Sequence, residues 1–400
     1  MRTSLDGSLL AGVLARLSEV DNSRYPGDAG GRQPVHTCYV PADQVTGDVA
    51  AGWGADALAA LEENAPRPGV FAALFGMSGE LAEVVHAKVA AKLASEPVED
   101  LRIDFEDGYG VHADEDDDAV RCAELAAGWT SPPVGIRFKS FDTRASAERG
   151  IRTLDLFVTA LGRAPMLTLP KVTDVAQVAA LVDVLAVLEE RLGLDTLRFE
   201  IQIETTRSIV DAEGRLAIPR FLAAGGGRVS GLHFGTYDYT AACGLSAAEQ
   251  HLAHPACDFA RHVMQVSAAG TGVRLSDGSS NVLPVGDGVG EAWRAHFGLV
   301  LRSLGHGFFQ GWDMHPAQLV SRYAANYAYY LRSVASDAKR LRTYVDSAAS
   351  GVLDEPATAQ ALAMSLRRAV DCGALSATDM AELTGLAEGE LAALSRREAL

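Results

Sequence analysis

Short apolar runs alternate with longer Ala- and Leu-rich stretches along most of the chain. The short runs have strand length, and the longer stretches repeat apolar residues at helical spacing. This alternation is typical of βαβ units that build a parallel sheet. The eight strands that it predicts are Val35–Val40, Leu101–Asp104, Val134–Phe138, Leu167–Leu169, Arg198–Ile203, Gly231–Phe234, Val273–Leu275 and Gly307–Gln310.

Helical patterns lie between these strands. They are Glu80–Leu93, Asp116–Ala127, Ala145–Leu161, Val175–Leu192, Pro219–Ala224, Ala256–Ala268 and Glu291–Leu304. Together with a further helix beginning near Pro316, this order predicts a closed TIM (β/α)8 barrel. An open doubly wound sheet fits less well, because no GxGxxG turn follows the first strand.

The barrel is predicted over residues 35–334, after an N-terminal helical segment at 1–34 and before a helical C-terminal extension at 335–400. Pro316–Arg332 and Asp337–Leu400 have helical patterns, with further breaks near Gly351–Pro356 and Cys372–Ser376. We interpret the extension as a cap or a subunit contact.

Composition narrows the classes of partner. A chain of 400 residues with 48% hydrophobic and 22% charged residues is typical of a globular protein with a large core. The formal net charge of −17 argues against nucleic acid as a partner, because such partners require clustered Lys and Arg. The N-terminus lacks a signal-peptide layout. No apolar run approaches the roughly 20 residues that span a bilayer. We therefore expect no membrane partner and a soluble, cytoplasmic protein.

The five cysteines are an odd number at wide spacings without CxxC pairs. This pattern indicates neither a disulfide framework nor a zinc site. We expect the cysteines to be buried and to pack as small hydrophobic residues.

Ionisable side chains follow most of the predicted strands, where a barrel assembles its active site. We expect these groups to meet at one rim while the strand interiors remain apolar. The residues at the strand ends are Glu106 and Asp107, Arg137 and Lys139, Lys171, Glu204, Asp238, Asp277 and Asp313.

Two of these carboxylates, Glu204 and Asp238, suit a divalent cation. They follow consecutive strands and lie 34 residues apart, about one strand–helix–strand repeat, so both can reach the barrel mouth. Mg2+ commonly takes one or two protein carboxylates and completes its shell with water and substrate oxygens. Such an ion polarises the ketone of a 2-oxo acid and stabilises its enolate. The alternative is that each carboxylate caps a helix or pairs with an arginine.

Six segments, in order and spacing, resemble the HpcH/HpaI aldolase and citrate lyase superfamily, nearest to the branch of the citrate lyase beta subunit and malyl-CoA lyase. They are DFEDGYG, GIRFKSF, LPKVTD, IQIETTRSI, GLHFGTYDYTAACGL and GFFQGWDMHPAQL. The resemblance covers roughly Val35 to Leu319. It implies a barrel of the phosphoenolpyruvate/pyruvate type, dependence on Mg2+ (or Mn2+), and aldol or Claisen cleavage of a carbon–carbon bond.

Carried over residue by residue, the resemblance makes Glu204 and Asp238 the metal ligands. It gives Arg137 the role of binding the substrate carboxylate or oxyanion, for which a planar guanidinium fork is suited.

The resemblance also implies that Glu106 and Asp107 order metal-bound waters and substrate. Lys171 would steady the acidic cluster, with a purely structural ion pair as the alternative.

Departures from the family pattern leave the substrate open. Lys139 stands where these lyases usually have Asn, and Trp312-Asp313-Met314 replaces the usual residues before His315. The segments Gly52–Gly76 and Gly270–Gly290 have no clear counterpart. A small carboxylic acid and an acyl-CoA ester both remain open as substrates.

Three further residues are candidates for the substrate site. Thr236 and Tyr237 are expected to shape the loop or donate a hydrogen bond, and His315 is expected to wall the site or cap a helix rather than act as a base. Asp277 and Asp313 are alternative bases.

Rival functions are a phosphoenolpyruvate-utilising or other transferase on the same barrel, and a non-catalytic homologue that binds a metal or an acid. We also expect a homo-oligomer, a trimer or hexamer, because family members commonly assemble so. The Tyr-rich stretch Tyr323–Tyr330 offers aromatic contact area for such an interface.

Overall fold

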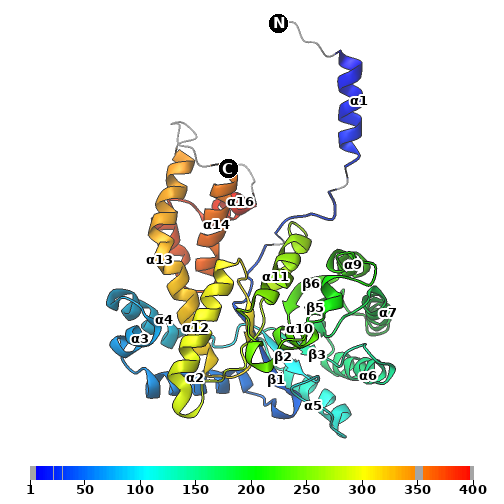
Figure 1. Cartoon of the computed structure of the whole chain (residues 1–400), viewed down its shortest axis with the longest axis horizontal. Helices are drawn as coiled ribbons and strands as arrows, with labels where there is room; N and C mark the ends of the chain where they lie inside the picture. The colour runs from blue at the N-terminus through cyan, green and yellow to red at the C-terminus, as the bar shows by residue number, and fades with distance from the viewer. Residues whose placement is uncertain (1–5, 21, 29, 347–354, 397–400) are drawn as a thin grey trace.

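The computed structural model describes residues 6–20, 22–28, 30–346 and 355–396. Its centre is a sheet of eight parallel strands in the order β7-β6-β5-β4-β3-β2-β1-β8 (Figure 1). A parallel bridge between Ser276 and Gln310 closes this sheet into the predicted barrel. The strands are β1 (His36–Pro41), β2 (Leu101–Asp104), β3 (Val134–Arg137), β4 (Met166–Leu169), β5 (Phe199–Ile203), β6 (Val229–Phe234), β7 (Arg274–Ser276) and β8 (Gly311–Asp313).

Helices cover the outside of the barrel, and all seven that the pattern predicts are present. The barrel helices are α2 (Val49–Asn64), α3 (Pro68–Phe75), α4 (Gly79–Ser95), α5 (Glu115–Ala127), α6 (Arg144–Leu161), α7 (Val175–Leu192), α8 (Thr206–Ile209), α9 (Ile218–Ala224), α10 (Thr236–Ala242), α11 (Pro255–Ala268) and α12 (Val289–Gly305). Helices α2 and α3 lie largely within the segment without a family counterpart and were not predicted.

Helix α7 shows how the sequence specifies these elements. Asp174 caps its N-terminus in a capping box with Gln177, and Gly193 ends it in the left-handed conformation at φ 64°. Its inward stripe consists of Val178, Leu181, Leu185 and Leu188. Each such side chain contributes roughly 1.5–3 kcal/mol by leaving water.

The barrel interior is polar, so the prediction of apolar strand interiors was wrong. Arg102 on β2 donates to Glu200 on β5 across the barrel, with Nη2–Oε1 at 2.7 Å and Nε–Oε2 at 3.2 Å. Thr168 and His233 also contact this carboxylate. The alternating apolar residues, such as Ile103 and Ile201, are buried toward the helices. The apolar core therefore lies between the barrel and its helices. A TIM barrel usually has a second apolar core inside the barrel, and this chain has polar residues there instead.

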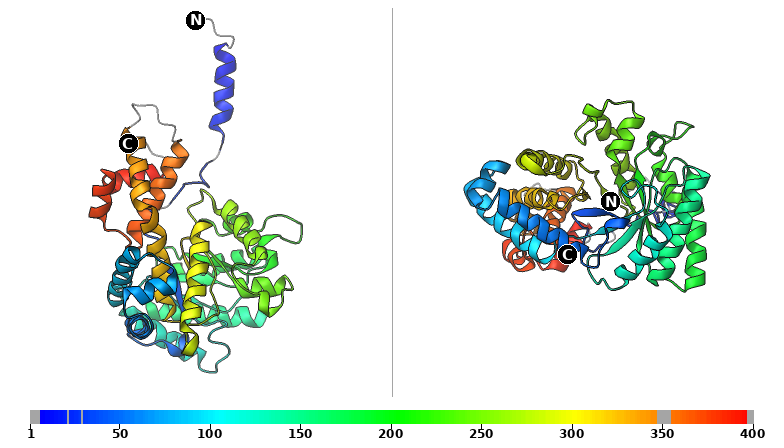
Figure 2. Two further views of the ribbon diagram at one scale, coloured as in Figure 1. Left: turned by 60° about the vertical axis from the view of Figure 1, so that its left-hand side comes forward. Right: turned by 90° about the horizontal axis from the view of Figure 1, so that it is seen from below.

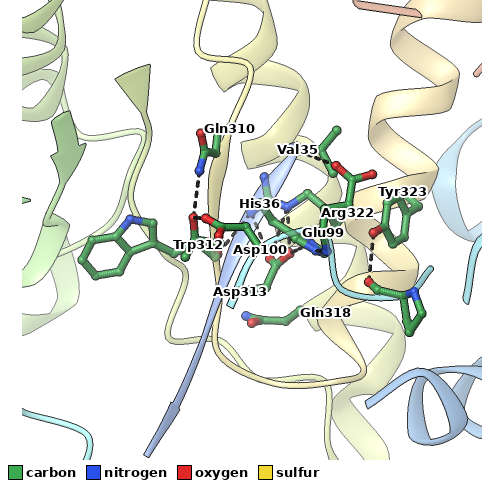
Figure 3. Close-up of polar contacts among 12 residues, drawn as sticks. Val35, His36, Glu99, Asp100, Gln310, Trp312, Asp313, Gln318, Arg322 and Tyr323 are labelled. Carbon is green, nitrogen blue, oxygen red and sulfur yellow. Dashed lines mark hydrogen bonds and ion pairs between the residues drawn. The ribbon is translucent and has the colours of Figure 1, made fainter. Parts of the chain in front are cut away.

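The eighth strand was predicted four residues too early. Phe308 and Phe309 are buried outside the sheet, and Phe309 packs on Tyr330 with ring centroids 6.2 Å apart. The strand is Gly311–Asp313, and its buried Asp313 is tolerated because Arg322 and His36 neutralise and hydrogen-bond it (Figure 3).

The C-terminal extension begins inside one long helix. Helix α13 (Gln318–Asp346) runs unbroken through residues 332–337, where a break was predicted, so the boundary expected at 334/335 falls within it. Helices α14 (Pro356–Asp371) and α15 (Ala377–Thr384) pack beside it, and α16 (Glu388–Ser395) packs against α14 (Figure 2). The expected break near Cys372–Ser376 is confirmed, whereas most of Gly351–Pro356 lies outside the described residues.

The tyrosines of α13 do not form the expected interface surface. Tyr323, Tyr327 and Tyr330 are at most 5% exposed because they pack inside the chain. These tyrosines therefore do not support the expected homo-oligomer, which stays a prediction.

Helix α1 (Gly7–Ser18) stands apart from the rest of the molecule and buries none of its residues (Figures 1 and 2). Within the described ranges, no single helix is long and apolar enough to cross a membrane, and α3 with α4 passes that test only as a pair bent by 106°. All five cysteines are unpaired as predicted; four are buried, whereas Cys243 is exposed.

Candidate functional site

The carboxyl ends of β2 to β6 bring six charged side chains to one mouth of the barrel. Glu106 and Asp107 follow β2, Arg137 ends β3, Lys171 follows β4, Glu204 follows β5, and Asp238 lies in the first turn of α10 after β6. Parallel strands that pair in register deliver such residues to the same edge.

Glu204 is the most buried of these carboxylates, at 3% exposure. Burial, together with the charges of Asp238 and Glu106, raises the pKa of Glu204 to about 8. Its Oε1 accepts a hydrogen bond of 2.7 Å from the Lys171 backbone N–H. Asp238 is exposed at the rim, and partial burial and the charge of Asp107 raise the pKa of Asp238 as well. A buried carboxyl group therefore lies close to other carboxylates at this end of the barrel.

Gly235 makes room for the Glu204 side chain. A Cβ at position 235 would lie 2.3 Å from the Glu204 Cβ and 2.4 Å from its Oε2. Only glycine permits that approach without displacing the carboxylate. Gly235, which directly follows β6, therefore helps to position the Glu204 carboxylate.

Arg137 is held in place by Asp104, a residue that the sequence did not single out. Both residues are buried, and the Arg137 Nε and Nη2 donate to the two Asp104 carboxylate oxygens, each at 2.6 Å. Asp104 also accepts hydrogen bonds from the backbone N–H groups of Glu106 and Gly108, both at 2.9 Å. One carboxylate therefore fixes both the guanidinium and the loop that carries Glu106 and Asp107.

The other face of Arg137 lies over aromatic rings. Its Cζ is 5.0 Å from the Tyr39 ring centroid and 5.9 Å from that of Trp312. The remaining nitrogen, Nη1, lies 3.5 Å from Glu106 Oε2. Nη1 is therefore the nitrogen that Asp104 leaves available to a substrate anion.

Lys171 adopts a left-handed backbone with φ of 51°, which is uncommon for a residue with a side chain. In that conformation its N–H reaches Glu204 while its Nζ donates to Glu106 and, at 2.6 Å, to Asp107. Burial opposes ionisation of Asp107, but the hydrogen bond and charge of Lys171 outweigh it and lower the pKa of that carboxyl. The predicted contact between Lys171 and the acidic pair is present.

The three candidates for the substrate site have different surroundings. Thr236 is 1% exposed, and its Oγ1 has no hydrogen-bond partner among the described residues. The Tyr237 hydroxyl accepts a 2.6 Å hydrogen bond from the Asn281 N–H and so anchors the loop after β7. His315 Nδ1 accepts from the Ala317 N–H at 3.2 Å, which fits the expected helix cap at the start of α13.

Asp277 and Asp313 are not suited to act as bases. Asp277 is 1% exposed and accepts a hydrogen bond of 2.7 Å from Arg261 Nη1. Asp313 is fully buried; burial alone would raise its pKa, but Arg322 with His296 and His36 outweighs burial and holds the pKa of Asp313 well below its usual range. His36 Nε2 accepts from the Glu99 N–H, so its Nδ1 carries the proton donated to Asp313 (Figure 3).

The residues at the mouth fit a hard divalent cation. Across the described ranges no group of three or more His, Cys, Asp or Glu residues is arranged to hold a metal, so Glu204 and Asp238 would act as a pair. Two carboxylates suffice for Mg2+, which keeps several water ligands. Burial and the neighbouring Asp238 and Glu106 raise the pKa of Glu204, and a bound cation would favour its charged form instead.

This fold and site define a closed (β/α)8 barrel with an acidic, arginine-containing mouth. A crystal structure of a citrate lyase from Burkholderia xenovorans LB400 is similar, with a TM-score of 0.58 and 20% identity over 89% of this chain and 98% of the other. Haloferax volcanii malate synthase is similar in its lead(II) complex, with a TM-score of 0.51 and 15% identity over 92% and 99% of the two chains. Its magnesium/glyoxylate complex gives a TM-score of 0.50 and 14% identity over 92% and 98%. These similarities confirm the barrel expected from the superfamily resemblance.

A family model described as a domain of unknown function, DUF6986, matches residues 14–399. The chain belongs to this family. No curated protein matches it in sequence.

Proposed function

We propose that the chain is a Mg2+- or Mn2+-dependent carbon–carbon lyase, or a Claisen-type enzyme of the same kind. Its substrate would be a 2-oxo acid, a hydroxy acid or a CoA ester bound at the acidic mouth. The observation that carries the proposal is the buried Glu204 beside Asp238 and Glu106, next to the Arg137 cation. The similar malate synthase was solved with magnesium and glyoxylate, which supports this class of substrate.

Glu204 and Asp238 would hold the cation. A divalent ion there supplies positive charge that polarises a carbonyl group and stabilises an enolate. Arg137 would neutralise a substrate carboxylate through Nη1, the nitrogen that Asp104 leaves unbound. Lys171 would keep Glu106 and Asp107 in place through its Nζ contacts.

In the cleavage direction, a substrate hydroxyl loses its proton and its oxygen electrons form a carbonyl as the carbon–carbon bond breaks. The bond's electron pair remains on the other fragment as an enolate, which then takes up a proton. Excluding water at this point strengthens every charge interaction, and Glu204, Glu106 and Arg137 are each less than one-tenth exposed.

A substrate screen with matched variants tests the proposal. Purified protein with Mg2+ or Mn2+ is given hydroxy acids, 2-oxo acids and acyl-CoA esters, and release of pyruvate, glyoxylate, oxaloacetate or acetyl-CoA is followed. We expect Glu204→Ala and Asp238→Ala to abolish turnover and Mg2+ binding by calorimetry while the fold is retained. Asp183→Asn, an exposed carboxylate on α7, is the control and should change neither. Unchanged Mg2+ affinity in both alanine variants would refute the assignment, and turnover of phosphoenolpyruvate alone would favour the transferase.

A further inference from the structure

A cavity of about 1090 Å³ lies at the end of the barrel opposite the acidic mouth. Its wall includes residues at the beginning of strands, among them Met166 of β4, Val229 of β6 and Arg274 of β7. The segment before β1, including Arg24 and Tyr25, forms another part of its wall. Its volume is at the upper end of the range for small-molecule sites.

The cavity wall is positive although the chain as a whole carries a formal charge of −17. Five arginines and four carboxylates line it: Arg24, Arg32, Arg102, Arg198 and Arg274, and Glu96, Glu99, Asp100 and Glu200. A local excess of positive charge in an acidic protein favours binding of an anion at that place.

All four carboxylates already have cationic partners. Glu96 and Glu99 pair with both Arg32 and Lys92. Asp100 and Glu200 pair with Arg102 from its two sides. None of these four carboxylates forms an ion pair with Arg24, Arg198 or Arg274.

Three arginines are left for a ligand. Arg24 and Arg198 are exposed to solvent and line the cavity, and neither makes a hydrogen bond or an ion pair with any residue that the structure describes. Arg274 donates to the backbone carbonyls of Gly30, Gly31 and Arg32, and partial burial lowers its pKa. Arg274 alone of the three is partly withdrawn from water, and a bound anion would lower the cost of holding its charge there. The exposed Arg24 and Arg198 would add attraction for the same anion.

The cavity also presents a buried polar group without a partner. His233 is 2% exposed and its Nε2 lies 3.2 Å from Glu200 Oε1, whereas its Nδ1 has no hydrogen-bond partner among the described residues. Buried polar atoms in folded proteins are usually satisfied, so this nitrogen beside the cavity could form a hydrogen bond with a ligand bound there.

We propose that this cavity binds a small organic polyanion, carrying two or more carboxylate or phosphate groups, through Arg24, Arg198 and Arg274. The site lies at the opposite end of the barrel from Glu204, and its existence does not depend on the proposed lyase activity. Prolines and aliphatic residues such as Leu222 and Val273 would contact the body of the ligand.

Calorimetry on the full-length protein in EDTA tests this proposal, because removal of free divalent ions prevents metal-mediated binding at the acidic mouth. The probes are adenosine triphosphate, propane-1,2,3-tricarboxylate and inorganic phosphate, which separate phosphate from carboxylate recognition and a polyanion from a simple anion. We expect at least one of the two polyanions to bind with Kd below about 1 mM, and more tightly than inorganic phosphate.

Charge reversal locates the site. Arg24→Glu with Arg198→Glu should weaken that binding by roughly tenfold or more, and neither change removes a contact that holds the fold. Arg191→Glu, an exposed arginine of α7 outside the cavity, is the matched control and should bind as the wild type does. Glu204→Gln should also bind as the wild type does, which separates this site from the proposed catalytic one.

Three results would overturn the proposal: neither polyanion binds at about 10 mM, the double charge reversal binds as tightly as the Arg191→Glu control, or Glu204→Gln alone removes binding. Circular dichroism and thermal unfolding of the double variant confirm that a loss of binding is not a loss of fold.

Discussion

Replacing Arg137 by lysine tests the centre of the candidate site, because the change keeps the charge and removes the planar fork. Arg137 donates from Nε and Nη2 to Asp104 and lies over the rings of Tyr39 and Trp312. A lysine ammonium can replace one of the two bonds to Asp104 but cannot hold both and still present a nitrogen to a substrate.

The expected loss can be worked from these contacts. One charge-assisted hydrogen bond contributes about 1.5–3 kcal/mol to the free energy of unfolding. An unfolding entropy near 2.1 cal/mol/K per residue over 400 residues converts this loss into a fall in Tm of about 2–4 °C. If Nη1 contacts the substrate in the transition state, the same range corresponds to a roughly 10- to 150-fold loss in kcat/KM.

Thermal unfolding, Mg2+ calorimetry and turnover of the substrate found by the screen measure these effects. Mg2+ affinity should survive, since Arg137 is not a proposed ligand, and kcat should fall if the contact strengthens as the enolate forms. Arg207→Lys is the control, because the Arg207 side chain is half-exposed and its ion pair with the exposed Asp174 is long at 3.8 Å. Such a surface pair contributes little to stability. Wild-type Tm and kcat/KM in Arg137→Lys would show that neither the fork nor its orientation matters.

Three further outcomes are expected. Gly235→Ala should displace Glu204, cost about 1–3 kcal/mol of stability and weaken Mg2+ binding. Gly298→Ala within α12 is the control: a Cβ there would meet open space, so the change should be neutral or slightly stabilising. Equal Tm and equal Mg2+ affinity in the two variants would contradict this prediction. The pKa of Asp313 is lowered in the folded protein, so its contribution to stability is complete above the unfolded pKa of about 3.9 and is lost as pH falls below that value. The Tm of the wild type should therefore drop more steeply between about pH 4.5 and 3 than the Tm of Asp313→Asn. Parallel curves of Tm against pH would exclude this role. Light scattering should find a homo-oligomer, and a monomer at micromolar concentration would count against it.

The order of the fold was predictable because short apolar runs coincide with β1 to β6 and overlap β7. The eighth strand was not, since Phe308 and Phe309 are more apolar than Gly311–Asp313 and pack against helices instead. Asp313 belongs in a strand only because His36 and Arg322 surround it, and His36 is 277 residues away. A partner at that separation leaves no local signal.

Part of the candidate site was also predictable from the order of the strands. Glu204 and Asp238 follow strands one repeat apart, so strand order alone brings them to the same mouth. The role of Asp104 depends on a pair with Arg137 across neighbouring strands, and the φ of Lys171 depends on its three contacts. Local sequence does not report such contacts.

The polar barrel interior has a consequence for how this family changes over time. Arg102 and Glu200 lie 98 residues apart and neutralise each other where neither reaches water freely. Among the described residues, losing Arg102 leaves Glu200 with only His233 as an ion-pair partner, and losing Glu200 leaves Arg102 with only Asp100. Breaking a buried pair of this kind costs about 3–5 kcal/mol, while replacing both residues by packed apolar residues can be nearly neutral. Relatives should therefore keep both residues or lack both, and intermediates with one alone should be rare. An alignment of distant relatives would reveal this barrel by such paired changes even where the motifs at its mouth have diverged.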